Sequence, residues 1–127
     1  MIRGLLKGIP VSEGIAIGKV RIMESPWDEV VERRIKKSEV KHEMERYEHA
    51  LILAAQQLAE CRDRVQQEIG DEEALIFEAH LAILNDPFFQ EEIPHSIEKF
   101  RRNTEYLLKS GIEKLNRSFQ KIKSDYF

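Results

Sequence analysis

Residues 38–70 read SEVKHEMERYEHALILAAQQLAECRDRVQQEIG, and this stretch decides the fold. Its apolar side chains recur at alternating steps of four and three residues: Val40, Met44, Tyr47, Leu51, Ala54, Leu58, Cys61 and Val65. That spacing predicts one long amphipathic helix, with Ser38 as a candidate N-cap and Gly70 as its stop. Because a single apolar seam cannot bury itself, we expect a second helix to return along it.

The next segment is too apolar for a helix with a single buried face. After an acidic start at residues 71–73, which suits a helix N-terminus, apolar residues follow at Leu75, Ile76, Phe77, Leu81, Ile83 and Leu84. This pattern predicts burial from two directions, or one buried face and one exposed face that binds a partner. Residues 85–87, Asn-Asp-Pro, are typical of a helix end followed by a new N-cap, and Pro94 is expected to break or kink the helix after it.

A second long seam begins near the cap candidates Asn103 and Thr104. It comprises Leu108, Ile112, Leu115, Phe119, Ile122 and Tyr126. We expect this helix to be the partner of the first seam, so that helical hairpins form a small four-helix-type bundle. The seam is still running at Phe127, and the chain is therefore expected to be truncated within its last helix.

The N-terminal stretch differs from the rest of the chain. Residues 4–23 hold four of the six glycines, and two short strands are expected there, at Leu5–Ile9 and Ile15–Ile22. Two strands alone are marginal in water and need further strands or a packing layer. We therefore predict a mainly α protein: residues 1–25 are the first strands of an incomplete α/β domain, and residues 26–127 form the helical domain.

Composition excludes several classes of function. The chain has 23 acidic and 20 basic residues, and a formal net charge of −3 gives no support to nucleic-acid binding. The single cysteine, Cys61, cannot form an intrachain disulfide framework, and its place on the first seam favours burial over reactivity. Neither a signal peptide nor a membrane span is recognisable, so we expect a cytoplasmic protein without membrane association.

Two motifs in the chain resemble those of Enzyme I and its phosphoenolpyruvate-utilising relatives. Residues 8–19, GIPVSEGIAIGK, are similar to the family's opening G-x-x-x-S-P-G-I-A-x-G-K. Residues 74–87, ALIFEAHLAILNDP, are similar to the family's E-A-x-I-F-E-x-H-x-x-(L/I)-L-x-D. A weaker match is Ser124–Phe127, which resembles D-D-E-Y-L. The departures are Glu13, where the family usually has Pro, and Phe88, where an acidic residue is common.

The resemblance implies an α/β domain that is interrupted by a helical insertion of two hairpins, which binds the phosphocarrier HPr. The active histidine lies further on in such proteins, in a G-G-x-(T/S)-S-H setting. A separate C-terminal barrel binds phosphoenolpyruvate and Mg²⁺ and forms a homodimer. This chain is therefore expected to be inactive alone and to hold no cofactor. The sugar-transport, nitrogen-regulatory and dihydroxyacetone-kinase versions share the helical module, and the sequence does not separate them.

The same resemblance implies an HPr-binding surface on the second hairpin. Its candidate residues are the acidic Glu72, Glu78 and Asp86, the apolar Ala82, Ile83, Phe88, Phe89 and Phe119, and His80. HPr presents a basic rim around an apolar patch, so acidic and apolar side chains are the types that would recognise it. Phe119 also fits the core of the last seam.

Other kinds of site fit the residues less well. None of His42, His49, His80 and His95 lies in a Gly/Ser/Thr-rich loop that could cradle a phosphoryl group, so we expect no catalytic residue in this chain. Glu39-x-x-His42 and Glu92-x-x-His95 have the spacing of di-iron bundles, but such a site needs inward-facing ligands and two further glutamates. We expect no metal site; a di-metal bundle and a stand-alone helical interaction module remain as alternatives. Because the strands lack their partners and the final helix lacks its last turns, apolar surface is expected to be exposed, which predicts self-association or swapped helices.

Overall fold

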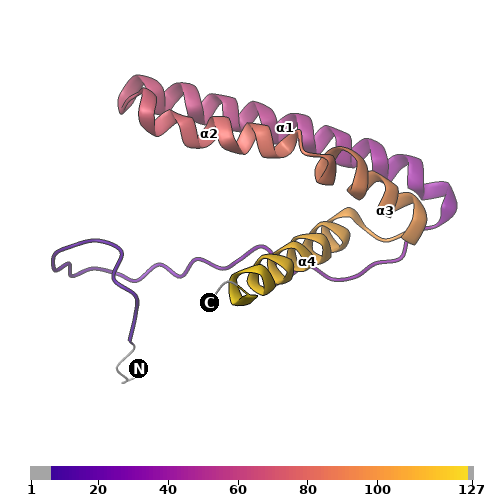
Figure 1. Ribbon diagram of the computed structural model, residues 1–127, viewed down its shortest axis with the longest axis horizontal. Coiled ribbons are helices and arrows are strands. Elements are labelled where there is room, and N and C mark those ends of the chain that lie inside the picture. The colour runs from indigo at the N-terminus through magenta and orange to yellow at the C-terminus, as the bar shows by residue number, and fades with distance from the viewer. Residues whose placement is uncertain (1–6, 126–127) are drawn as a thin grey trace.

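The computed structural model describes the backbone of residues 7–125 and the side chains of residues 7–121. Its helices are a 3₁₀ turn η1 (Lys37–Glu39), α1 (Val40–Glu68), α2 (Asp71–Leu84), a π-helical turn η2 (Phe88–Glu92), α3 (Ile93–Phe100) and α4 (Thr104–Asp125). Figure 1 shows α1 and α2 as a long antiparallel hairpin, with α3 beside the first part of α1. The predicted class, a mainly α protein built from helical hairpins, is confirmed.

The helix boundaries follow the local signals in the sequence. The helical stretch starts just before Ser38, because the Glu39 carboxylate accepts the Lys36 N–H at 2.6 Å and caps the η1 turn. Between α2 and η2, the Asp86 carboxylate accepts the Phe88 N–H at 2.8 Å, as expected for an N-cap followed by Pro87. Pro94 lies in the first turn of α3, directly after the π-helical turn η2, so one continuous helical stretch runs from Phe88 to Phe100 through the proline. Pro94 therefore does not end the helix, and the wider π turn comes immediately before it.

The core lies where α1, η2, α3 and the first turns of α4 meet. Its buried members are Ile35, Tyr47, Phe88, Ile93, Ile97 and Leu107. The Tyr47 hydroxyl, buried with its ring, donates to the Phe89 carbonyl at 2.8 Å, and this burial raises the pKa of Tyr47 to about 12. Gly111 of α4 lies against the Phe88 ring, which leaves no room for a side chain at that position.

Two expectations about packing were wrong: α4 is not the main partner of the first seam, and Phe119 of the α4 seam is not in the core. The first seam of α1 packs against α2 and α3, whereas α4 makes its main helix contact with α3 and then points away from the hairpin (Figure 1). Of the α4 seam, Leu108 and Ile112 join the core, but Leu115 is 42% exposed and Phe119 is 69% exposed. Alternating steps of four and three residues indicate that a helix has an apolar partner, but not which helix that partner is.

The expected strand at Ile15–Ile22 is also absent from the described residues. Its apolar side chains are at least 81% exposed, because no neighbouring strand or helix within residues 7–125 packs on them. Of the expected strand Leu5–Ile9, the structure describes residues 7–9, which form no strand, and residues 5 and 6 lie outside the described residues.

Cys61 is half-buried on α1, and its sulfur accepts a long hydrogen bond of 3.6 Å from Arg64.

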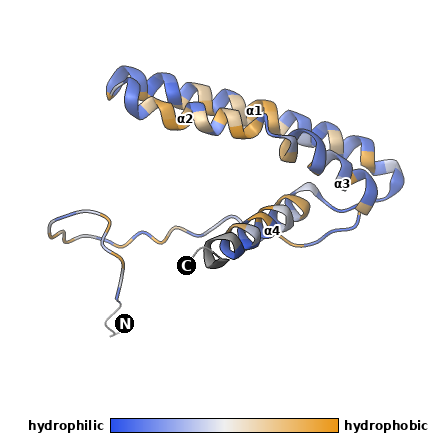
Figure 2. Cartoon of the chain, in the orientation of Figure 1, coloured by the Kyte–Doolittle hydropathy of each residue, from blue (hydrophilic) through white to orange (hydrophobic). Residues whose placement is uncertain are grey.

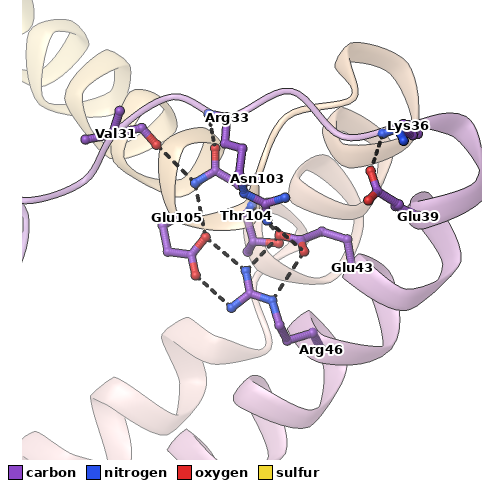
Figure 3. Close-up of polar contacts among 9 residues, drawn as sticks. All are labelled: Val31, Arg33, Lys36, Glu39, Glu43, Arg46, Asn103, Thr104 and Glu105. Atoms are coloured by element: carbon purple, nitrogen blue, oxygen red, sulfur yellow. Dashed lines mark hydrogen bonds and ion pairs between the residues drawn. The ribbon is translucent and has the colours of Figure 1, made fainter.

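The extended segment that precedes η1 is fastened to the start of α4 by Asn103, which is 6% exposed. The side-chain oxygen Oδ1 of Asn103 accepts the Arg33 backbone N–H at 2.8 Å, and its side-chain nitrogen Nδ2 donates to the Val31 backbone carbonyl at 3.2 Å (Figure 3). A backbone bridge between Arg34 and Arg102 continues the contact. The segment therefore leaves the helical body in a fixed direction.

Replacing Asn103 with alanine should release this segment. We expect the free energy of unfolding to fall by about 1–2 kcal/mol, because the Arg33 N–H and the Val31 carbonyl lose a buried partner. The Arg33 amide should then exchange with solvent faster, which hydrogen exchange measures directly. Asn116→Ala, at an exposed position of α4, is the matched control. Equal exchange at Arg33 in both variants would contradict the role given to Asn103.

Candidate docking face on helix α2

Helix α2 has two apolar faces that point in different directions. Ala74, Phe77, Leu81 and Leu84 are buried or half-buried on the side that packs against α1. On the outward side, Leu75 is 62% exposed, Ile76 is 57% exposed and Ile83 is 52% exposed. The small exposed residues Ala79 and Ala82 complete this outward stripe, and Figure 2 shows hydrophobic residues along α2. The sequence pattern that was too apolar for one face is thus resolved into a packing face and an uncovered face.

The stripe lies in the most acidic part of the chain. Residues 65–98 contain nine Asp and Glu residues and no Lys or Arg. On α2, the Glu78 carboxylate accepts Arg62 at 3.0 Å, and Asp71 accepts the Gln66 amide at 2.8 Å. Glu72 is exposed on the outward side and makes no ion pair within the described part of the chain. The face therefore has a negative potential with one carboxylate that is free to bind a cation.

Several of the predicted docking residues lie together on this face. Glu72, Ala82 and Ile83 are exposed on its outward side, and His80 borders it with its ring edge-on to Phe77, at 6.3 Å between centroids. Glu78 is exposed on the other border, where Arg62 holds it. Asp86 follows the end of α2 and is exposed, although its carboxylate is engaged with the Phe88 N–H.

The three phenylalanines do not belong to the outward face. Phe88 is 8% exposed and lies in the core, so its expected role as a docking contact has to be corrected: the π-helical turn after Pro87 directs the ring inward. Phe89 is half-buried and packs edge-to-face on Phe88 at 5.0 Å. Phe119 is exposed, but it lies on α4, which packs on α3.

Three residues of the face were missing from the sequence-based set: Leu75, Ile76 and Ala79. A signal for them existed, since Leu75 and Ile76 belong to the apolar excess of this segment. At 100° per residue, both lie on the opposite side of the helix from Phe77, Leu81 and Leu84. Helical phase groups these residues on one side of α2, and the contact of the other side with α1 shows that theirs is the uncovered one.

Within the described residues, no three His, Cys, Asp or Glu side chains converge in a way that could hold a metal ion. Glu39, His42, Glu92 and His95 are all exposed, so the Glu-x-x-His pairs do not point into the bundle as di-metal ligands would. None of the helices in the described part of the chain has the length and apolar character needed to cross a bilayer.

Comparison with known proteins gives matches to a single family. Residues 7–127 match the family model described as PEP-utilising enzyme, N-terminal. The chain is 31% identical over 121 residues to the phosphoenolpyruvate-protein phosphotransferase of Listeria innocua serovar 6a. This alignment covers 95% of the chain and 21% of the Listeria protein. The chain is 31% identical to the enzyme of the same name from Bacillus subtilis and 33% identical to the one from Priestia megaterium. Both alignments again cover 95% of this chain and 21% of the relative.

The chain thus spans about a fifth of the length of these curated relatives. No solved structure matches it. The family model covers almost the whole chain, and the relatives align along nearly all of it, including both motifs that suggested the resemblance. The chain therefore belongs to the family of PEP-utilising enzymes, N-terminal region.

Proposed function

We propose that this chain is the docking part of a phosphoenolpyruvate-protein phosphotransferase, and that it binds an HPr-type phosphocarrier protein. The observation that supports the proposal is the outward face of α2, an uncovered apolar stripe in a stretch with nine acidic and no basic residues. HPr, as the family resemblance implies, offers a basic rim around an apolar patch. The two surfaces are complementary in both charge and polarity.

The two kinds of side chain would have different effects on binding. Carboxylates such as Glu72 raise the association rate and set the orientation, because their attraction reaches beyond contact distance. Leu75, Ile76 and Ile83 supply most of the affinity, because burying them removes apolar area from water. Glu78 is already paired with Arg62, so its net contribution should be smaller than that of Glu72.

The proposal gives these residues recognition and no bond-making step. In the parent protein, phosphoenolpyruvate would transfer its phosphoryl group to a histidine and release pyruvate, and that histidine would pass the group to bound HPr. We place this histidine, phosphoenolpyruvate and Mg²⁺ outside the residues of this chain. Holding HPr on α2 would convert the second transfer into a reaction between groups already brought together.

Replacing Ile76 with glutamate should weaken HPr binding at least tenfold, which corresponds to about 1.4 kcal/mol. The side chain lies in the centre of the stripe and is 57% exposed, so the change removes apolar contact without opening the core. Isothermal titration calorimetry with HPr would measure the dissociation constant, and raising the ionic strength should weaken the unaltered complex.

The matched control is Leu53→Glu, the same kind of change on α1, where Leu53 is 46% exposed and lies away from the outward face of α2. It should leave the HPr dissociation constant within about twofold of the original. Circular dichroism would show that both variants are folded. If the two variants lost affinity equally, or if the folded, unaltered chain failed to bind HPr, the proposal would be wrong.

A further inference from the structure

The backbone carbonyl of Phe89 lacks a donor that the helix itself would normally supply. In the π-helical turn η2 a carbonyl accepts the N–H five residues later, and the Ile93 N–H accordingly bonds to the Phe88 carbonyl. The next bond in this register would join the Phe89 carbonyl to residue 94. That residue is Pro94, which has no N–H, so the bond cannot form.

Tyr47 of α1 supplies the donor from outside this helical stretch. Its hydroxyl donates to the Phe89 carbonyl at 2.8 Å, and the residue is 3% exposed. Because burial raises the pKa of Tyr47 to about 12, the hydroxyl keeps its proton at neutral pH. Tyr47 and Pro94 are therefore coupled: the proline removes one backbone hydrogen bond, and a tyrosine 42 residues before Phe89 replaces it.

The turn η2 is in turn bonded to the last turn of α2. The Asp86 carboxylate accepts the Phe88 N–H at 2.8 Å. The Gln90 side-chain amide donates to the Leu84 carbonyl at 2.6 Å. These bonds join η2 to the part of α2 that carries Ile83, an exposed apolar residue of the outward face. A displacement of η2 would therefore move this end of the face relative to α1.

We propose that the Tyr47 hydroxyl is a positioning group for carrier binding: through the Phe89 carbonyl it holds η2, and with it the end of the outward face of α2, in the orientation that HPr recognises. Tyr47 is buried in the core, so it acts through η2 and not by touching the carrier. This role rests on the proposed docking function. When the anchors of a surface are not held in place, ordering them on binding reduces the affinity.

A pair of changes tests the coupling through stability. Tyr47→Phe keeps the ring and removes only the hydroxyl, which leaves the Phe89 carbonyl without this donor. Urea unfolding should show that the equilibrium constant of folding falls about tenfold, which corresponds to about 1.4 kcal/mol. Pro94→Ala restores an N–H at residue 94, so Tyr47→Phe should lower the constant by less than about threefold in that background.

The control is Tyr106→Phe, which removes the same hydroxyl from a half-buried position on α4. Its effect on the equilibrium constant of folding should be the same with Pro94 and with alanine at that position, because Tyr106 does not donate to the Phe89 carbonyl. Equal effects of Tyr47→Phe in the two backgrounds would reject the coupling between Tyr47 and Pro94.

Calorimetric titration with HPr then separates positioning from stability. Tyr47→Phe, shown by circular dichroism to be folded under the conditions of the titration, should raise the HPr dissociation constant about threefold or more. The double change Tyr47→Phe with Pro94→Ala should return the constant to within about twofold of the original, and Tyr106→Phe should leave it within the same range.

The other outcomes of the titration would overturn the positioning role. A folded Tyr47→Phe chain that binds HPr as tightly as the unaltered chain would show that the hydroxyl contributes to stability only. A loss of affinity that Pro94→Ala does not restore would act through some group other than the Phe89 carbonyl. If the unaltered chain fails to bind HPr, the docking proposal falls and the positioning role falls with it, whereas the stability measurements still decide whether Tyr47 and Pro94 are coupled.

Discussion

Replacing Phe88 with alanine is expected to lower the free energy of unfolding by about 3–5 kcal/mol. Phe88 is 8% exposed, packs edge-to-face on Phe89 and lies against Gly111 of α4. Removing the ring leaves a cavity where three elements meet, and small domains have only about 5–15 kcal/mol of total stability. Urea unfolding followed by circular dichroism would measure the loss.

The control is Phe119→Ala, which removes the same ring from a position that is 69% exposed, and should change the stability by less than about 0.5 kcal/mol when the chain is monomeric. The comparison separates a core aromatic from a surface aromatic. If Phe88→Ala left the stability unchanged and instead weakened HPr binding, Phe88 would be a docking residue after all, as the sequence suggested.

Replacing Gly111 with alanine tests the same contact from the α4 side. A Cβ atom there would lie 2.7 Å from the Phe88 ring, so the ring or the helix must move. We expect a net destabilisation, because overpacking costs about 1–3 kcal/mol and alanine's higher helix propensity recovers only about 1 kcal/mol. Stabilisation of the variant, measured by the same urea titration, would show that the contact is looser than the structure gives it.

Replacing Glu43 with glutamine is expected to lower the free energy of unfolding by about 2–3 kcal/mol at neutral pH. The Glu43 carboxylate is 4% exposed, yet it is charged: it accepts Arg46 at 2.7 Å and the Thr104 N–H at 2.8 Å (Figure 3). Arg46 also donates to Glu105 at 2.7 Å, so the cluster joins α1 to the first turn of α4. The hydrogen bond from Arg46, with further bonds from Thr104, outweighs burial and lowers the pKa of Glu43 to about 2.

The pKa of Glu43 determines how stability depends on pH. It is lower in the folded chain than the ordinary value of 4.5, so the charged cluster contributes fully above about pH 4.5 and its contribution is lost as pH falls toward 2. The difference corresponds to about 3 kcal/mol. Urea unfolding between about pH 6 and pH 2 should therefore show a smaller acid dependence for Glu43→Gln than for the unaltered chain.

Glu45→Gln is the control for Glu43→Gln. Its carboxylate lies on the surface of α1, 3.8 Å from Lys41, and such exposed pairs contribute about 0–1 kcal/mol. The control should therefore keep the full acid dependence of the unaltered chain. An identical pH profile for Glu43→Gln and the unaltered chain would show that the buried carboxylate does not stabilise the contact between α1 and α4.

The parts of the fold that depend on neighbouring residues could be predicted from the sequence. The seam from Val40 to Val65 identified α1, and the Asn-Asp-Pro sequence at residues 85–87 located the break after α2. The acidic start at Asp71 and the caps near Asn103 and Thr104 marked two further helices. Each of these signals acts within one or two helical turns, so no knowledge of tertiary packing is needed to interpret it.

The parts that depend on distant residues could not be predicted in this way. Asn103 fastens a segment 70 residues earlier in the chain, and Glu43 reaches Thr104 across 61 positions. Nothing in the spacing of the α1 and α4 seams says that α2 and α3, and not α4, occupy the first seam. The inward turn of Phe88 likewise depends on the π-helical geometry after Pro87, which no local rule predicts.

In the candidate site, too, local sequence patterns predicted some features, while others depend on tertiary packing. The apolar excess of residues 75–84 predicted either burial from two directions or one buried and one exposed face, and the structure has the second arrangement. The pattern did not assign Leu75, Ile76 and Ala79 to that face, because the direction toward α1 was unknown. Family resemblance then added Phe88 to the candidates, although the ring is in the core. Spacing identifies candidates, and packing decides which of them a partner can reach.

The central claim, that the outward face of α2 binds an HPr-type carrier, is tested most directly by mapping that contact on the chain itself. The measurement is a titration of the ¹⁵N-labelled chain with unlabelled HPr, followed by two-dimensional NMR. We predict that the amide signals of Glu72, Ile76, Ala79 and Ile83 shift or broaden together, while those of residues 45–55 on α1 stay in place. Saturating HPr that leaves the α2 signals of the folded chain unchanged would contradict the account.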